Sequence, residues 1–196
     1  MKIGKIAYGC MLLSFILIFT LSPALADAET RYLKNNIHYQ ERPGRGGKIE
    51  CKASYANWTD PGEGHKILPV NTGVEINVSR GWRGRKLTIT KLADGKLIHF
   101  EYNERNMGIP MAEYINIISS PKKVSLKGLS NLDRKGISNG KAYKGMSKKG
   151  IQMAFGYPAS HRTPSLKDNT WTFWKDRYRM TVIVFNSAGK VVEIRQ

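Results

Sequence analysis

Residues 145–195 combine a short helix with marked ends and three β-rich runs, and this combination restricts the fold more than any other part of the chain. Apolar residues recur at i, i+3 and i+4, the spacing of one buried helix face. They are Ile151, Ala154 and Phe155. Ser147 is placed as the N-cap, and Gly156, followed by Pro158, is placed to end the helix. The sequence therefore predicts a helix of about two turns.

Three runs rich in β-branched and aromatic residues follow this helix. They occupy residues 171–175, 178–185 and 191–195. Short polar segments separate them, as is typical of hairpin connections. A helix packed on an antiparallel three-stranded meander is the simplest arrangement that buries the apolar side of both.

Four segments of this region also follow one another in a familiar order. They are Gly145-Met146-Ser147, Phe155-Gly156-Tyr157-Pro158, the aromatic run 169–174 and the stretch 184–189. Together they resemble the SmpA/OmlA (BamE-like) family of outer-membrane assembly lipoproteins. The resemblance implies a fold of two helices and three strands, and a binding or scaffolding role without catalysis. It also implies that the segment after the helix contacts partners or anionic lipid, through residues such as His161 and Arg162.

The N-terminus has the three-part layout of a secretory signal peptide over residues 1–26. Lys2 and Lys5 precede an uncharged run at 10–21, and an Ala-x-Ala site follows at 24–26. Cleavage there would lower the net charge from +17 to +15, because the peptide carries two lysines and no acidic residue. Family members carry a lipid on a cysteine after the apolar run, whereas Cys10 stands at its start. We therefore expect an exported periplasmic protein without that anchor, at most peripheral to the outer membrane.

The remaining chain divides by composition. A polar, glycine-rich segment at 27–47 is expected to be a flexible lead-in. Short strand-like runs at 66–70, 74–79, 85–90 and 97–102, with glycine-rich turns between them, predict a small barrel-like β domain over 48–120, closed by a helix at 111–119. Residues 121–140 are interpreted as a basic linker, and 141–196 as the BamE-like domain with its first helix shortened or lost. The predicted fold class is α+β.

A strongly basic exported protein requires an anionic partner outside the cytoplasm, which excludes nucleic acid as the main candidate. Lipid headgroups, wall polymers and acidic faces of envelope proteins remain. The densest cluster of cations surrounds one aromatic ring and consists of Arg80, Trp82, Arg83, Arg85 and Lys86. A second candidate surface, suggested by the resemblance, consists of Tyr157, His161, Arg162 and Trp174.

The sequence contains no nucleophile elbow, zinc-protease motif, C-x-x-C pair or phosphate-binding glycine loop, and it predicts no cofactor or metal. The leading hypothesis is thus a non-enzymatic periplasmic adaptor in envelope or outer-membrane assembly. One alternative is an inhibitor or sensor of a periplasmic enzyme, since a helix-plus-meander fold also resembles proteinaceous β-lactamase inhibitors. Another is a thiol-dependent wall hydrolase that pairs Cys51 with His65 or His99.

Overall fold

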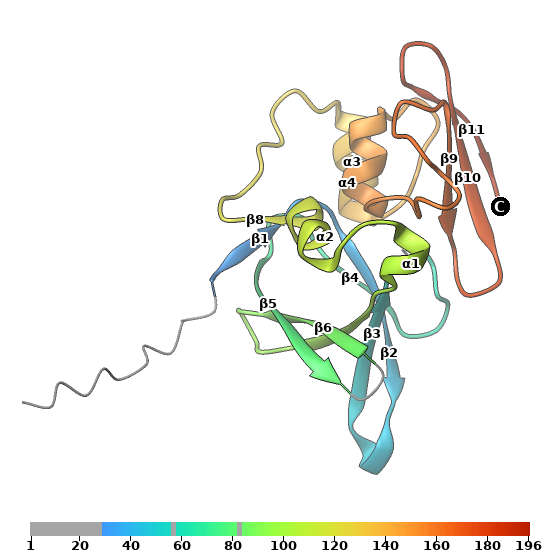
Figure 1. The fold of residues 1–196 in the computed structure, drawn as a ribbon. Helices are drawn as coiled ribbons and strands as arrows, with labels where there is room; N and C mark the ends of the chain where they lie inside the picture. The colour runs from blue at the N-terminus through green and yellow to red at the C-terminus, as the bar shows by residue number, and fades with distance from the viewer. Residues whose placement is uncertain (1–28, 56–57, 82–83) are drawn as a thin grey trace, which may run out of the picture.

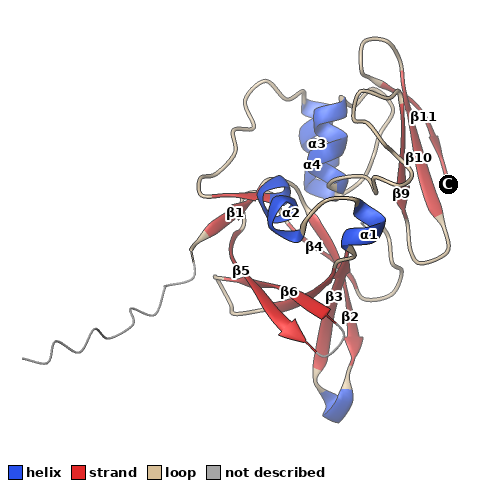
Figure 2. Cartoon of the chain, in the orientation of Figure 1, coloured by secondary structure: helices blue, strands red, loops and turns tan. Residues whose placement is uncertain are grey.

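The computed structural model describes residues 29–55, 58–81 and 84–196 (Figure 1). The predicted signal peptide lies outside these residues. The chain forms a curled eight-stranded sheet followed by two helices and a three-stranded sheet (Figure 2). The predicted α+β class is confirmed.

The first half is built on the eight-stranded sheet, whose order is β4-β2-β3-β7-β6-β5-β1-β8. Its strands are β1 (Arg31–Leu33), β2 (Ile37–Pro43), β3 (Ile49–Ser54), β4 (His65–Leu68), β5 (Gly73–Gly81), β6 (Gly84–Lys91), β7 (Leu97–Glu101) and β8 (Ser119–Ser120). β3 and β7 run parallel, and the other neighbouring strands run antiparallel. Because β1 leads directly into β2, the chain connects opposite ends of the strand order. The sheet therefore curls around one core.

Side chains alternate between core and solvent along these strands, as a half-buried sheet requires. On β7, Ile98 and Phe100 are buried while their neighbours are exposed. The curled sheet is capped by α1 (Glu104–Met107) and α2 (Met111–Ile118), which contribute Met107, Met111, Tyr114 and Ile118 to the core. Pro110 is the N-cap residue of α2, which corresponds to the helix predicted at 111–119.

The lead-in predicted as flexible over 27–47 is wrong for most of its length, because it supplies β1 and β2. Leu33 and Ile37 are fully buried in the first core. The polar residues that suggested flexibility, among them Asn36 and His38, are buried as well and make hydrogen bonds. Composition could not distinguish a solvated segment from one whose polar groups have partners inside the protein.

The linker predicted over 121–140 contains a helix, α3 (Asn131–Asn139). We expected this helix to be shortened or lost because of its glycines. Ser130 and Asp133 form a capping box at its start, and Gly140 ends it in the left-handed conformation, with φ of 58°. Strong caps and burial of one face therefore outweigh the low helix propensity of glycine.

The predicted helix between Ser147 and Gly156 is α4 (Lys148–Phe155). The Ser147 side chain accepts a hydrogen bond from the Gly150 amide, as an N-cap should. Gly156 follows with φ of 85°, in the region that favours glycine. The apolar face predicted for this helix is buried in the second core.

Asp133 joins the two helices of this pair. Its Oδ1 accepts the Ser147 amide at 2.7 Å, and its Oδ2 accepts the Ser130 hydroxyl at 2.9 Å. Burial raises the pKa of Asp133, but these hydrogen bonds outweigh burial and lower it overall. A Cβ at Gly150 would lie 2.1 Å from Oδ1 of Asp133, so the close approach of the helices requires glycine there.

The three β-rich runs form an antiparallel sheet in the order β11-β10-β9. The strands are β9 (Thr170–Trp174), β10 (Met180–Phe185) and β11 (Val191–Arg195). Their inward residues Trp171, Phe173, Ile183 and Phe185 pack in one core with residues of α4. The aromatic run is thus mostly core, and only Trp174 is half-buried.

Lys148 fastens the loop between α4 and β9 to the helix. Its ammonium donates to the carbonyls of Lys167 and Asp168 at 2.9 and 2.7 Å and lies 5.7 Å from the centre of the Trp171 ring. Charge-assisted hydrogen bonds of this kind are stronger than neutral ones. The Lys148 side chain thus stabilises this loop in place of the hydrogen bonds of a helix or strand.

We expect Lys148→Met to lower the free energy of unfolding by about 2 kcal/mol, because the loop carbonyls lose a charged donor. Lys149→Met is the matched control, since Lys149 is exposed and makes no hydrogen bond to a described residue. Urea denaturation measures both. Equal losses in the two variants would contradict this role of Lys148.

Candidate functional site

The two halves of the chain contact each other through an interface of buried polar side chains, which we call the seam. Asn36, which is 1% exposed, donates through Nδ2 to the carbonyls of Ile137 at 2.7 Å and Ala154 at 3.3 Å. Its Oδ1 accepts the Val70 amide at 2.9 Å, and its own amide donates to the Met153 carbonyl at 2.8 Å. The last carbonyls of a helix have no partner within the helix. Asn36 of the first half therefore caps the C-terminal ends of both α3 and α4.

His38 extends this seam. Its Nε2 lies 2.8 Å from the Ala154 carbonyl, and its Nδ1 lies 2.9 Å from Nε2 of His65. Because a carbonyl can only accept, His38 carries its proton on Nε2. Burial lowers the pKa of His38 to about 4, so the ring is neutral and its Nδ1 accepts the proton of His65 Nε2.

The hydrogen bond to His38 determines which ring nitrogen of His65 carries the proton. Its Nδ1 lies 3.9 Å from Oδ1 of Asp60, whose Oδ2 is 3.3 Å from the ammonium of Lys175. Burial lowers the pKa of His65, although the Asp60 carboxylate opposes this effect. The neutral ring therefore presents an unprotonated Nδ1 toward Asp60. The pairing of β2 with β4 brings His38 and His65 into contact, although they are distant in sequence.

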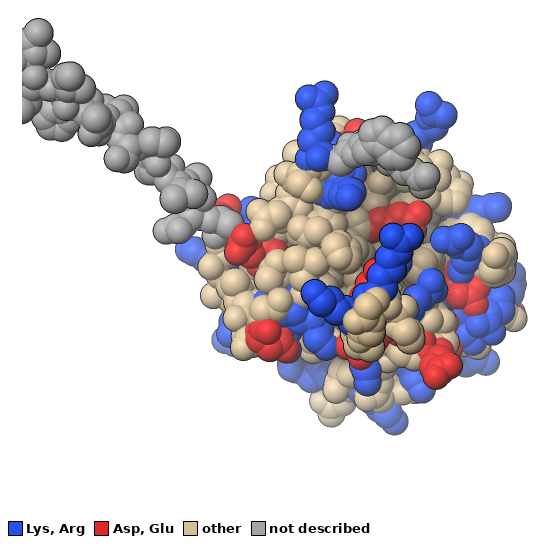
Figure 3. Space-filling view, turned by 90° about the horizontal axis from the view of Figure 1, so that it is seen from below, with Lys and Arg blue, Asp and Glu red and all other residues tan. Residues whose placement is uncertain are grey.

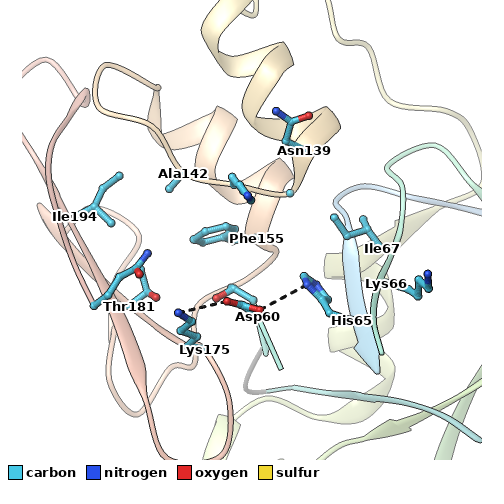
Figure 4. Close-up of a pocket in the computed structure, with 14 residues that line it drawn as sticks. Asp60, His65, Lys66, Ile67, Asn139, Ala142, Phe155, Lys175, Thr181 and Ile194 are labelled. Atoms are coloured by element: carbon cyan, nitrogen blue, oxygen red, sulfur yellow. Dashed lines mark ion pairs between the residues drawn. The ribbon is translucent and has the colours of Figure 1, made fainter. Parts of the chain in front are cut away.

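A cavity of about 640 Å³ lies beside this seam, between the two halves. Figure 4 shows His65 and Ile67 of β4 directed toward it, whereas Lys66 points away. Its other walls come from the α3–α4 pair and the three-stranded sheet. Those walls contribute Asn139, Gly140, Lys141, Ala142, Phe155, Lys175, Thr181, Ile194 and Gln196, and Thr59 and Asp60 complete the lining. We call this space the interdomain cavity.

A second concavity, of about 540 Å³, is lined by cations and aromatic rings from both halves. Its charged and aromatic lining consists of Arg42, Lys52, Trp58, Arg85, Lys86, His99, Phe100, Glu101, Tyr102 and Arg177. We call it the basic groove. A smaller hollow of about 340 Å³ continues it at Arg42, Trp58 and Arg177, toward the turn between β9 and β10.

The charge of the basic groove is largely uncompensated. Its lining contains five cationic side chains, two lysines and three arginines, but one carboxylate, that of Glu101. Lys52 forms an ion pair with Glu50 at 2.8 Å. The other cations, Arg42, Arg85, Lys86 and Arg177, form no ion pair with any described residue. The Arg42 guanidinium lies 6.0 Å from the centre of the Trp58 ring, so a cation and an aromatic surface are held together.

The cluster predicted around Arg80 lies at the hairpin of β5 and β6. Arg80 is the register partner of Arg85, and Ser79 is the partner of Lys86. All three cations are exposed. Trp82 and Arg83 lie outside the described residues. Seen from the side of the β2–β3 hairpin, Lys and Arg side chains spread over the face of the molecule with fewer acidic ones among them (Figure 3).

The second predicted surface is divided by the structure. His161 and Arg162 are exposed, and the His161 ring stacks near Trp174 with ring centres 6.4 Å apart. Tyr157 instead packs against the first core, and burial raises the pKa of its hydroxyl. Tyr157 lines a hollow with Lys34, Ile117 and Met153, whose lining does not include Trp174. The resemblance to the SmpA/OmlA family had grouped them.

Cys51 lies on β3 with its side chain in the first core, and burial raises the pKa of its thiol. His99 is exposed on the opposite face of the sheet, because it is paired in register with Lys52 rather than with Cys51. His65 contacts His38 instead. Neither imidazole is therefore placed to activate this thiol.

Across the described ranges, no helix is both long and apolar enough to cross a membrane. In the comparisons with known proteins, the chain matched no protein-family model, no curated protein and no solved structure.

Proposed function

We propose that the protein is an exported, non-enzymatic binding protein of the cell envelope that holds phosphate- or carboxylate-bearing envelope components in its basic groove. The observation that carries this proposal is the composition of the groove: four cations without an ion pair to a described residue line it together with Trp58, Phe100 and Tyr102. Uncompensated charge beside a low-dielectric wall concentrates anionic ligands. Aromatic rings add a surface on which sugar or headgroup atoms can pack.

A relationship to the SmpA/OmlA family is part of the same proposal. The pair α3–α4, the three-stranded sheet and the aromatic core support it, together with the Gly-Met-Ser segment that fixes the two helices. On this view the second half is a docking module in envelope or outer-membrane assembly, and the first half adds most of the anion-binding surface. The signal-peptide pattern at 1–26 supports export.

Binding to candidate envelope components tests the proposal. We expect the protein to cosediment with phosphatidylglycerol vesicles or with peptidoglycan sacculi, but not with phosphatidylcholine vesicles. The double variant Arg85→Gln/Lys86→Gln should bind about thirtyfold more weakly, since each of the two cations contributes about 1 kcal/mol at an anionic surface and about 1.4 kcal/mol corresponds to a factor of ten. The matched control is Lys122→Gln/Lys127→Gln, which removes two exposed lysines outside the groove.

The vesicle and sacculus experiments distinguish a lipid ligand from a wall ligand. The proposal fails if neither anionic partner sediments the protein, or if the control variant loses as much affinity as the groove variant.

A further inference from the structure

We propose that the interdomain cavity is a second ligand site, which takes a small organic anion carrying a carboxylate or a phosphate. This inference is independent of the basic groove, since the two linings share no residue. It rests on two threonine hydroxyls, lysine ammonium groups and apolar side chains that line the same cavity.

Two threonine side chains contribute hydroxyl groups to the cavity. Thr59 and Thr181 line the cavity and are 5% and 3% exposed, and neither hydroxyl makes a hydrogen bond to a described residue. The hydroxyls are not among the buried polar atoms that lack a partner in the described residues, which are those of Tyr114 and Trp171, so they remain accessible from the cavity. These hydroxyls come from separate halves of the chain, Thr59 beside the end of β9 and Thr181 on β10. A ligand in the cavity can reach both.

Lysine side chains contribute positive charge to the cavity. Lys141 and Lys175 line the same cavity, and Lys175 is held in place by Asp60 at 3.3 Å. Lys141 has no ion pair with a described residue. The lining contains three lysines, Lys66, Lys141 and Lys175, and one acidic side chain, that of Asp60, so its side chains carry an excess of positive charge that favours an anionic headgroup.

Apolar groups complete the site. Phe155, Ile67 and Ile194 contribute apolar side chains to the lining (Figure 4). A pocket with an apolar wall and a few convergent polar groups is the usual form of a small-molecule site. The ligand class is therefore an anion with a small apolar body, held by its headgroup at Lys141, Lys175 and the two hydroxyls.

The close packing of α3 on β4 keeps the cavity in its present shape. A Cβ on Gly140 would lie 2.3 Å from Cδ1 of Ile67 and 2.9 Å from Cε1 of His38. The end of α3 therefore rests directly on the first half. The site exists because the two halves are docked.

Titration of the full chain with phenyl phosphate, benzoate and uncharged benzyl alcohol tests this inference, followed by amide chemical shifts in nuclear magnetic resonance. We expect one or both anions, but not the alcohol, to shift the amides of Thr59, Gly140 and Thr181. The two anions distinguish a phosphate from a carboxylate ligand. Lys175→Gln should weaken binding about tenfold, the effect of one charge-assisted hydrogen bond.

The variant Thr181→Val tests whether anion binding can be weakened without a loss of folding stability. Because the hydroxyl has no partner among the described residues, the isosteric change should leave stability unchanged or raise it while weakening anion binding. Arg85→Gln in the basic groove should not alter these titrations. The inference is overturned if neither anion binds, if Lys175→Gln and Thr181→Val bind like the wild type, or if the shifts follow Arg85 instead.

Discussion

Asn36→Ala is expected to destabilise the protein by about 3 kcal/mol. The substitution removes two donors and one acceptor from a buried site, and it leaves the carbonyls of Ile137 and Ala154 and the amide of Val70 with fewer partners. Each buried backbone group that loses its partner costs about 1 kcal/mol or more. The two halves should also unfold less cooperatively with each other, because the Asn36 side chain connects both helices of the second half to the first half.

Chemical denaturation combined with amide hydrogen exchange measures both effects. Asn131→Ala is the matched control, since Asn131 is exposed at the start of α3 and its side chain makes no hydrogen bond to a described residue. Surface substitutions of this type usually change stability by less than about 0.5 kcal/mol. If Asn36→Ala behaved like the control, the seam would not hold the halves together.

Acid should destabilise the protein through His38 well before the carboxylates are protonated. The pKa of this imidazole falls from 6.5 to about 4 on folding, because burial penalises the charged ring. Between these values the unfolded chain takes up a proton that the folded protein excludes. Stability is therefore full above pH 6.5 and is lost as the pH falls toward 4. One pKa unit corresponds to about 1.4 kcal/mol, so the loss is about 3 kcal/mol.

The neighbouring charges do not reverse this sign. Asp60 favours protonation of both imidazoles, but burial dominates for His38 and for His65, and the Lys141 ammonium also disfavours a charged His65. His38→Gln keeps a donor for the Ala154 carbonyl and cannot be protonated. Urea denaturation from pH 7 to 4 should show a loss about 3 kcal/mol smaller in His38→Gln than in the wild type. His161→Gln, at an exposed ring, should keep the wild-type slope, and equal slopes for all three proteins would refute the assignment.

The second half could be predicted from the sequence to a large extent, because its signals are local. Caps at Ser147 and Gly156 and the spacing of Ile151, Ala154 and Phe155 define α4 without reference to the rest of the chain. α3 was underestimated because its stability depends on Asp133, whose second partner, Ser147, belongs to the next helix. A helix that is stabilised by a neighbouring helix shows only a weak helix signal in its own sequence.

The sites were harder to predict than the fold. Arg85 and Lys86 belong to a run of cations that is visible in the sequence, but Arg42 and Arg177 join these two only through the folded arrangement. The pairing of His38 with His65 depends on the register of two strands. In the same way, Thr59 and Thr181 are ordinary strand and loop residues until the halves dock. Such sites leave no local pattern for a sequence to reveal.

The central claim is that cations from both halves act on one anionic ligand in the basic groove. Its most direct test is the salt dependence of binding to phosphatidylglycerol vesicles or to peptidoglycan sacculi for the wild type, Arg42→Gln, Arg177→Gln and the double variant, with Lys127→Gln/Lys167→Gln as control. Screening weakens charge-driven binding as salt rises. We predict lower affinity and a shallower salt dependence for each groove variant, the lowest values for the double variant, and no change in the control. Wild-type affinity and salt dependence in the double variant, or equal losses in the control, would contradict the account.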